Sequence, residues 1–446
     1  MSLMLRHSTV LMQVLKLPSK IMFNKSLYIT ILFVLTGCQM TSNLLESTIR
    51  PKSQNYSKGT MLLNNCDFTG IVELLDNNKN NLLKNSEKGL IYYYQNQSKK
   101  SNNYFDVAID MYRNNENKAL FDVSTFLTKE YQGEGYDKVF LHNYKAINYL
   151  TLGNAESARV EARNSNISQQ KARLELDKLK SKEKSSTNNY LLSRYEKLFN
   201  SIDAKHNPYQ NPFAYYISAL SYAEDEDYNN ALIDIRKALK FTPNSKILKE
   251  KLELYTKKKR VDSIELFFDI GQSPLKSEVQ IEIKLGNEEK RMVSLPTFSL
   301  SKSRIDYIEI LDSQGVTLAK TSLLSDINAI KINEFKEKLP AMLSLLSREL
   351  ALSVGSESLN SQSKLLAGVI KAGMAIYSQN DISTWSFLPQ KILVASFLAT
   401  KSQSYNMIIY AKDGTKLSSR SLVINKNSLT KNTYKHFFLK EEKMCY

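Results

Sequence analysis

The sequence predicts an α+β protein in which an all-α domain of helical hairpins is followed by an antiparallel, β-rich domain with inserted helices. Hydrophobic residues recur at helical spacing from about residue 61 to residue 258, and they alternate with polar residues from about residue 262 onward. The chain has 446 residues, of which 42% are hydrophobic, and this is enough for more than one core. We therefore expect a helical domain over residues 61–258 and a β-rich domain over residues 259–446.

The N-terminus has the features of a secretory signal. Lys25 precedes nine mostly apolar residues, Leu27 to Leu35, and the small residues Thr36 and Gly37 follow. The apolar run is too short to span a bilayer, which needs about 20 residues. Residues 1–37 are therefore expected to be a signal peptide, and Met22 is a second candidate for the initiator methionine.

The end of this signal resembles the lipobox of bacterial lipoproteins, which here reads Leu35, Thr36, Gly37 and Cys38. The resemblance implies that the Cys38 sulfur receives a diacylglyceryl group, that cleavage leaves Cys38 as the first residue, and that several acyl chains anchor the protein to membrane lipid. Gln39 follows, which by resemblance to enterobacterial sorting signals favours the outer membrane, with the body on the periplasmic face. Residues 38–60 are polar and are expected to form a lipidated tether. The alternative is a free cysteine after a short uncleaved anchor.

Two further cysteines, Cys66 and Cys445, belong to the expected mature chain. They could pair in the oxidising periplasm, or they could remain two unpaired thiols. Neither lies in a C-x-x-C motif, so they do not indicate a metal site.

The helical range contains degenerate repeats, and the clearest begins near Pro212. Six of its residues have the spacing of the 34-residue tetratricopeptide (TPR) unit: Ala219, Tyr222, Ala231, Ile235, Ala238 and Pro243. Small residues at these positions allow two helices to approach closely, and proline cannot continue the helix. Two weaker copies contain Ala146, Tyr149, Ala158, Ala162 and Ser165, and Gly89, Tyr92, Ser101, Phe105 and Ala108. The sequence thus predicts TPR-like hairpins, and generic antiparallel helices are the alternative.

The C-terminal range contains short runs of alternating apolar residues that predict strands, at 264–268, 279–285, 308–310, 392–397, 407–410 and 422–424. Turn sequences follow two of them, at Asp312–Gly315 and at Asp413-Gly414. A helical pattern at about 326–378 interrupts the strands, and its apolar part, 365–377, is expected to be a buried helix. We expect an antiparallel sheet or sandwich with helices inserted.

Several segments together resemble an uncharacterised family of TPR-containing lipoproteins from Gram-negative bacteria. They are the lipobox at Cys38, Lys88-Gly89-Leu90, Asp137–Arg163, Asn211-Pro212-Phe213, Leu295-Pro296, Leu324–Ala329 and Asp381–Pro389. The resemblance covers most of the mature chain. It implies an envelope location and TPR-type scaffolding, and it implies no enzymatic activity.

The composition argues against several classes of site. With 14 glycines, the chain has few residues for a glycine-rich phosphate or dinucleotide loop, and it has no P-loop or G-x-S-x-G sequence. Its four histidines, His7, His142, His206 and His436, have no paired metal-ligand spacing. The formal charge of +16 suits anionic lipid or acidic polymers, and the expected location excludes nucleic acid as a partner. We expect no catalytic residue, metal or cofactor.

Two arginines are candidates for partner contact. Arg159 and Arg163 flank Glu161 one helical turn apart, so they share a helix face and could clamp a partner's carboxylate. Ion pairs between neighbouring helices are the alternative. Trp385, the single tryptophan, is expected to fill a core.

These features predict a non-enzymatic outer-membrane lipoprotein that acts as a protein-interaction scaffold in envelope assembly or maintenance. Stacked hairpins would offer partner proteins a concave surface for an extended or helical peptide. Binding of peptidoglycan or another envelope polymer through the basic surface is the alternative, and a hydrolase with an unrecognised site is a third.

Overall fold

A computed structural model describes residues 51–116, 131–181, 209–259, 261–284, 290–299, 302–340, 383–399, 404–425, 432–441 and 443–445. By its internal contacts the chain forms two units, residues 1–53 and residues 54–446. The second unit is the folded body. The expected signal peptide and Cys38 with its lipobox lie outside the described residues.

The first part of the body is helical, as expected. Its labelled helices are α3 (Pro51–Asn64), α4 (Phe68–Asp76), α5 (Asn81–Tyr94), α6 (Ser98–Glu116), α8 (Gly135–Thr151), α9 (Ala155–Ser181), α11 (Pro212–Glu224), α12 (Tyr228–Phe241) and α13 (Lys246–Thr256). Helix α5 packs against α6, α8 against α9, and α11 against α12, at the positions of the three expected hairpins. Because α3 begins at Pro51, the end of the range expected as a tether is helical.

Local sequence explains where these helices start, stop and approach one another. The Asn211 side chain accepts a hydrogen bond from the Phe213 backbone N–H at 3.0 Å, and Pro212 occupies the first turn of α11. Pro243 lies in the turn that follows α12, as expected. Gly89 allows α5 to meet α6, since a Cβ atom there would lie 2.4 Å from the Phe105 ring.

The strands follow the helices along the chain. They are β1 (Ser263–Ile270), β2 (Leu275–Lys284), β3 (Lys290–Ser299), β4 (Ile305–Leu311), β5 (Thr317–Lys320), β6 (Ser322–Asp326), β7 (Lys391–Leu398), β8 (Ser404–Ala411), β9 (Lys416–Val423), β10 (Thr433–Lys440) and β11 (Lys443–Cys445). They form a five-stranded sheet in the order β11-β10-β1-β7-β6, a four-stranded sheet in the order β5-β4-β8-β9, and the β2-β3 pair.

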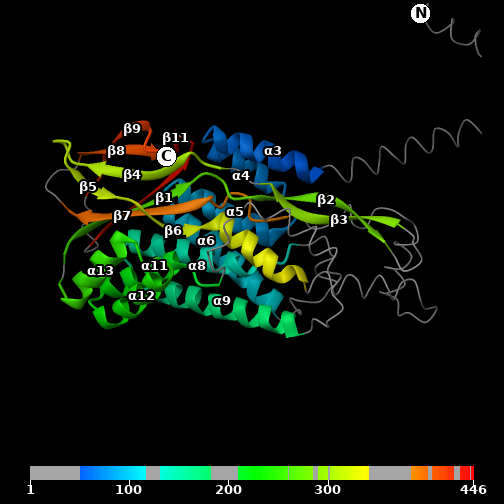
Figure 1. Ribbon diagram of the computed structural model, residues 1–446, viewed down its shortest axis with the longest axis horizontal. Coiled ribbons are helices and arrows are strands. Elements are labelled where there is room, and N and C mark those ends of the chain that lie inside the picture. Colours follow the sequence, from blue (N-terminus) through cyan, green and yellow to red (C-terminus); the bar gives the residue numbers. More distant parts are fainter. Residues whose placement is uncertain are drawn as a thin grey trace, which may run out of the picture. The chain divides into compact units, whose positions relative to one another are not determined.

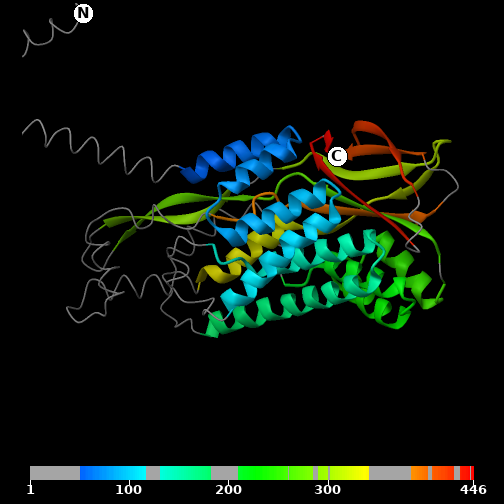
Figure 2. The ribbon, with the colours of Figure 1, turned by 180° about the vertical axis from the view of Figure 1, so that it is seen from behind.

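The five-stranded sheet is covered on both faces. Ile264, Leu266 and Phe268 of β1 belong to a core shared with the four-stranded sheet. Phe267, between them in sequence, belongs to a second core shared with the helices. Because successive strand residues point to opposite faces, the four-stranded sheet covers one face and helices cover the other (Figure 1 and Figure 2). The body is therefore layered as helices, sheet and sheet.

One expectation about the sheet is wrong. The β-rich part is not purely antiparallel, because β10 pairs in parallel with β1, from Ile264 opposite Thr433 to Ile270 opposite Leu439. Parallel neighbours need a long crossover connection, and here the chain builds the four-stranded sheet between β1 and β10. The sequence of β10 does not alternate because its residues are mostly buried on both faces.

The inserted helix is present where the described residues reach it. Residues 327–340 are helical and follow β6, whereas the apolar stretch 365–377 lies outside the described residues. The boundary near residue 259 marks the change from helices to strands along the chain. The two ranges on either side of it share one hydrophobic core, which contains Phe213 of α11, Phe267 of β1 and Phe438 of β10.

Candidate functional site

The first helices of the three hairpins, α5, α8 and α11, pack on the five-stranded sheet. Tyr93 of α5 stacks on His436 of β10 with ring centroids 3.8 Å apart. The ring centroids of Tyr94 and Phe438 lie 4.5 Å apart. Those of Phe213 and Phe267 lie 6.1 Å apart, and the edge of one ring faces the plane of the other. We call this side of the helices the inner helical face. The chain's own sheet covers it.

A buried ion pair joins α13 to β1. The Glu265 carboxylate pairs with the Lys251 ammonium of α13 and accepts hydrogen bonds from Tyr216 of α11 at 2.5 Å and from Ser396 of β7 at 2.8 Å. Burial raises the pKa of Glu265, but Lys251 and the hydrogen bonds from Ser263 and Tyr216 outweigh burial and hold it below its usual value. These contacts fix the sheet on the helices because each buried polar group needs its partner.

A second polar contact joins the end of α11 to the start of β10. Glu224 accepts hydrogen bonds from the Asn432 amide at 2.6 Å and from the Tyr434 hydroxyl at 2.5 Å. Asn432 in turn accepts from the Ser263 backbone N–H at 3.0 Å. Docking of the sheet therefore depends on specific polar partners as well as on apolar packing.

A buried cluster of charged groups lies where α5, α8, residues 327–340 and residues 383–389 meet. The Lys331 ammonium donates to the Ser273 hydroxyl at 2.8 Å and to the Trp385 carbonyl at 2.9 Å. Glu87 accepts from the Ser386 backbone N–H at 2.7 Å. Burial lowers the pKa of Lys331 to about 7 and raises the pKa values of Glu87 and Asp137 to about 7. Proton occupancy in this cluster therefore changes near neutral pH.

Asp269 of β1 is a buried acid of a different kind. In the described part of the chain, neither of its carboxyl oxygens completes a hydrogen bond, and neither do the Tyr93 and Tyr144 hydroxyls. Burial raises the pKa of Asp269 well above its usual value, and the nearby Tyr144 hydroxyl lowers it to a smaller extent. Burial therefore favours the protonated form of this carboxyl.

The arginines expected to contact a partner are engaged within the chain. The Arg159 guanidinium pairs at 2.7 Å with Asp225, which follows α11. Arg163 donates to the Tyr222 hydroxyl at 3.1 Å. These contacts correspond to the alternative of intramolecular pairing between neighbouring helices.

Glu161, between the two arginines in sequence, points into the α8–α9 pair. It lies 2.6 Å from the His142 ring nitrogen and 2.8 Å from the Lys145 ammonium. The His142 side chain is therefore buried and hydrogen-bonded within the protein.

The remaining TPR framework positions are core residues. Ala219 of α11 and Ala231, Ile235 and Ala238 of α12 are fully buried and belong to the large shared core. Trp385 is also fully buried, as expected, and lies edge-on to Phe105 at 6.3 Å. The side chains that the sequence identified are therefore mostly core residues.

Cys66 and Cys445 form a disulfide, which the sequence alone left undecided. Their Cα atoms lie 5.3 Å apart, within the range that disulfides require. The bond joins the turn after α3 to the last described strand, β11.

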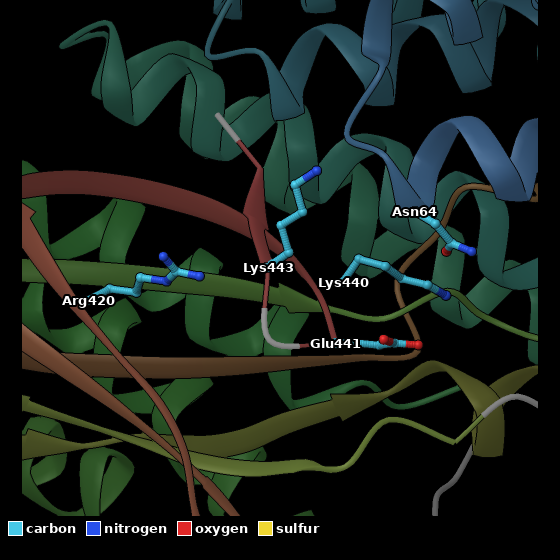
Figure 3. A pocket seen from close by; sticks show the side chains of 5 residues that line it. All are labelled: Asn64, Arg420, Lys440, Glu441 and Lys443. Carbon is cyan, nitrogen blue, oxygen red and sulfur yellow. The ribbon is translucent and has the colours of Figure 1, made fainter.

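Beside this disulfide lies a hollow of about 460 Å³ lined by Asn64, Arg420, Lys440, Glu441 and Lys443. Asn64 ends α3, Arg420 belongs to β9, and the other three belong to the β10–β11 hairpin. Figure 3 shows Asn64, Lys440 and Glu441 toward one end and Arg420 toward the other. Sequence reasoning missed this cationic site because its residues come from distant segments.

The described residues contain no group of three or more His, Cys, Asp or Glu side chains that could hold a metal ion. Among them, no helix combines the length and the apolar character needed to cross a membrane.

Comparison of the chain with models of known protein families, with curated proteins and with solved structures finds no match.

Proposed function

We propose that this chain is a non-enzymatic lipoprotein of the bacterial outer membrane that acts as a TPR-type interaction scaffold in envelope assembly or maintenance. The observation that carries the proposal is the lipobox at Cys38 followed by a body with a Cys66–Cys445 disulfide. Disulfides persist in oxidising compartments such as the periplasm. The disulfide therefore supports the location that the lipobox predicts.

The helix pairs support the TPR-type part of the proposal. In the clearest repeat, alanines 219, 231 and 238 are fully buried in the core to which α11 and α12 contribute, as small residues of TPR units are. Gly89 has the same role between α5 and α6. This packing supports a stack of hairpins as the scaffold.

Partner proteins would bind the outer helices α6, α9 and α12, because the chain's own sheet covers the inner helical face. These helices expose apolar side chains, namely Val107 of α6, Val160, Ile167 and Leu174 of α9, and Ile233 of α12. The α9 residues are spaced by seven, so they form a line along one side of the helix. Single exposed apolar residues are common, but a line of them suits contact with another helix.

Metabolic labelling tests the membrane anchor. Cells are fed labelled palmitate, and the label is expected to enter the protein but not a Cys38→Ser variant. A Cys66→Ser variant is the control for loss of a cysteine outside the lipobox, and it should keep the label although it breaks the disulfide with Cys445. Equal labelling of the Cys38→Ser variant, or unchanged processing and fractionation, would refute the anchor.

A pull-down tests the scaffold. The acylated protein should retain envelope proteins that a lipidated control domain does not retain. Replacing Ile167 and Leu174 by Ser should release them, because both side chains are exposed and contribute little to the core. No enrichment over the control domain would count against a scaffold.

The second candidate function is binding of peptidoglycan or another acidic envelope polymer, which the formal charge of +16 favours. Sedimentation with purified sacculi separates it from the first. Salt-sensitive co-sedimentation without other proteins would favour the polymer.

A further inference from the structure

We propose that the hollow beside the Cys66–Cys445 disulfide binds the phosphate of anionic lipid headgroups and so orients the folded body on the membrane. Three side chains around it, Arg420, Lys440 and Lys443, are cationic, and Glu441 is acidic. The charge of the hollow therefore favours an anion. The choice of a membrane lipid as its source rests on the proposed lipid anchor.

The β10–β11 hairpin contributes two lysines to the hollow. Lys440 and Lys443 are directly opposite each other in the register of the hairpin, and their side chains extend in different directions (Figure 3). Glu441, next to Lys440, has a left-handed backbone with φ of 51°, which is uncommon for residues other than glycine. This backbone conformation costs stability, and such costs gather at binding sites.

The lysines differ in their surroundings. Partial burial lowers the pKa of Lys440, and Glu441 counteracts this only in part. The Lys443 ammonium donates to the Asn65 carbonyl at 3.0 Å, which ties the hairpin to the end of α3. A phosphate oxygen would compensate the desolvated Lys440 ammonium through a charge-assisted hydrogen bond.

The disulfide keeps the walls of the hollow together. Cys66 follows Asn64 by two residues, and Cys445 follows Lys443 by two. Arg420 adds a planar guanidinium from β9, which is suited to bidentate contact with phosphate. The hollow therefore presents donors from three parts of the fold on a covalently closed frame.

The expected anchor permits contact with a membrane. The segment between Cys38 and Pro51, where α3 begins, can extend to at most about 45 Å. A body on this tether stays near the headgroup layer, where each basic residue adds attraction to anionic lipid.

The test measures binding of the full chain carrying Cys38→Ser, which cannot be acylated, to vesicles of phosphatidylglycerol in phosphatidylcholine. The test variant is Lys440→Gln/Lys443→Gln. The control is Lys246→Gln/Lys249→Gln, which removes the same charge from exposed positions of α13. The Lys440→Gln/Lys443→Gln variant is expected to bind vesicles about 30-fold more weakly than the parent protein, which corresponds to about 5-fold for each lysine. The binding of the control variant should weaken much less. Arg420→Gln should weaken binding about 5-fold as well.

Thermal unfolding verifies that each variant is folded, and the exposed Lys443→Gln substitution carries the test if the double variant unfolds. Equal losses in the hollow and control variants would overturn the proposal in favour of a general basic surface. Binding of inorganic phosphate or sacculi without binding of vesicles would overturn the membrane assignment. Because this protein has no acyl chain, the result does not depend on the palmitate experiment.

Discussion

Glu87 is a buried acid whose protonation changes near neutral pH. Burial raises its pKa from 4.5 to about 7 in the folded chain. Between these values the folded state holds a proton that the unfolded state has released, so the free energy of unfolding falls as pH rises. The full loss is about 3 kcal/mol by linkage.

We expect Glu87→Gln to remove this part of the pH dependence, because the amide stays neutral and its oxygen can still accept from Ser386. Urea unfolding of both proteins at pH 4.5 and pH 8 gives the measurement. Between pH 4.5 and pH 8, the free energy of unfolding of the variant should fall by about 3 kcal/mol less than that of the wild type. The exposed Glu250→Gln substitution is the control, and an identical pH profile for Glu87→Gln and wild type would contradict the assignment.

Gly89 carries a steric prediction. Because an added Cβ atom would lie 2.4 Å from the Phe105 ring, Gly89→Ala should destabilise the fold by about 1–3 kcal/mol. The smaller side chain of Phe105→Leu should make room for it. In a double-mutant cycle measured by thermal unfolding, the pair should therefore cost less than the sum of the single changes. Additive losses would show that α5 and α6 relax without conflict at this position.

Single residues differ in how far the sequence reveals them. The repeat spacing identified Gly89, Ala219 and Ala231 as close contacts, because helical hairpins place small residues at fixed intervals. The roles of Glu87 and Lys331 could not be read in the same way. Their partners come from residues 273 and 384–386, and such long-range polar contacts leave no local pattern. An acid within the apolar run SIELFFDI, at Glu265 or Asp269, was a signal that could have been used.

At the scale of elements, the contact between α13 and β1 depends on a buried ion pair. Lys251→Met would leave the Glu265 carboxylate buried without its cation, and we expect a loss of about 3–5 kcal/mol in urea unfolding. Lys251→Met/Glu265→Gln should recover most of this loss, since the amide is neutral and still accepts from Tyr216. If the double variant were no more stable than Lys251→Met, the lost interaction would be packing rather than charge.

The disulfide gives a second prediction at this scale. It closes a loop of 379 residues, so its removal frees a large part of the unfolded chain. Cys445→Ser is expected to lower the free energy of unfolding by about 2–5 kcal/mol. Reductant should lower the free energy of unfolding of the wild type to that of the variant, and it should leave the free energy of unfolding of the variant unchanged. A wild-type melting temperature insensitive to reductant would contradict a closed disulfide.

Most strands were predicted from an alternating stretch or an apolar run, but β10 was not. Strands β4 and β8 have polar and apolar residues in turn over part of their length, and β7 contains a run of apolar residues, so the sequence located each of them. Strand β10 reads TYKHFFLK, without alternation, because one face meets helices and the other lies over the four-stranded sheet. Missing β10 also meant missing its parallel pairing with β1.

At the scale of the whole molecule, the helical and β-rich ranges depend on one another. The core between them contains residues from α5, α8 and α11 and from β1, β7 and β10. The inner helical face is apolar, and without the sheet its polar groups, such as Glu224 and Tyr216, would lose their partners. Sequence reasoning divided the chain near residue 259 because periodicity is a local property and does not report which faces meet.

We therefore expect neither half to fold alone. A fragment of residues 39–259 should expose the inner helical face, bind a hydrophobic dye and unfold without a cooperative transition. Produced together with residues 260–446, it should assemble into a complex that survives non-reducing electrophoresis through Cys66 and Cys445, because the fragments carry one cysteine of the disulfide each. The Cys445→Ser version is the control and should assemble without the covalent link. If each fragment alone melted cooperatively near the temperature of the whole chain, the halves would be independent domains, and the inner helical face would again be open to an external peptide.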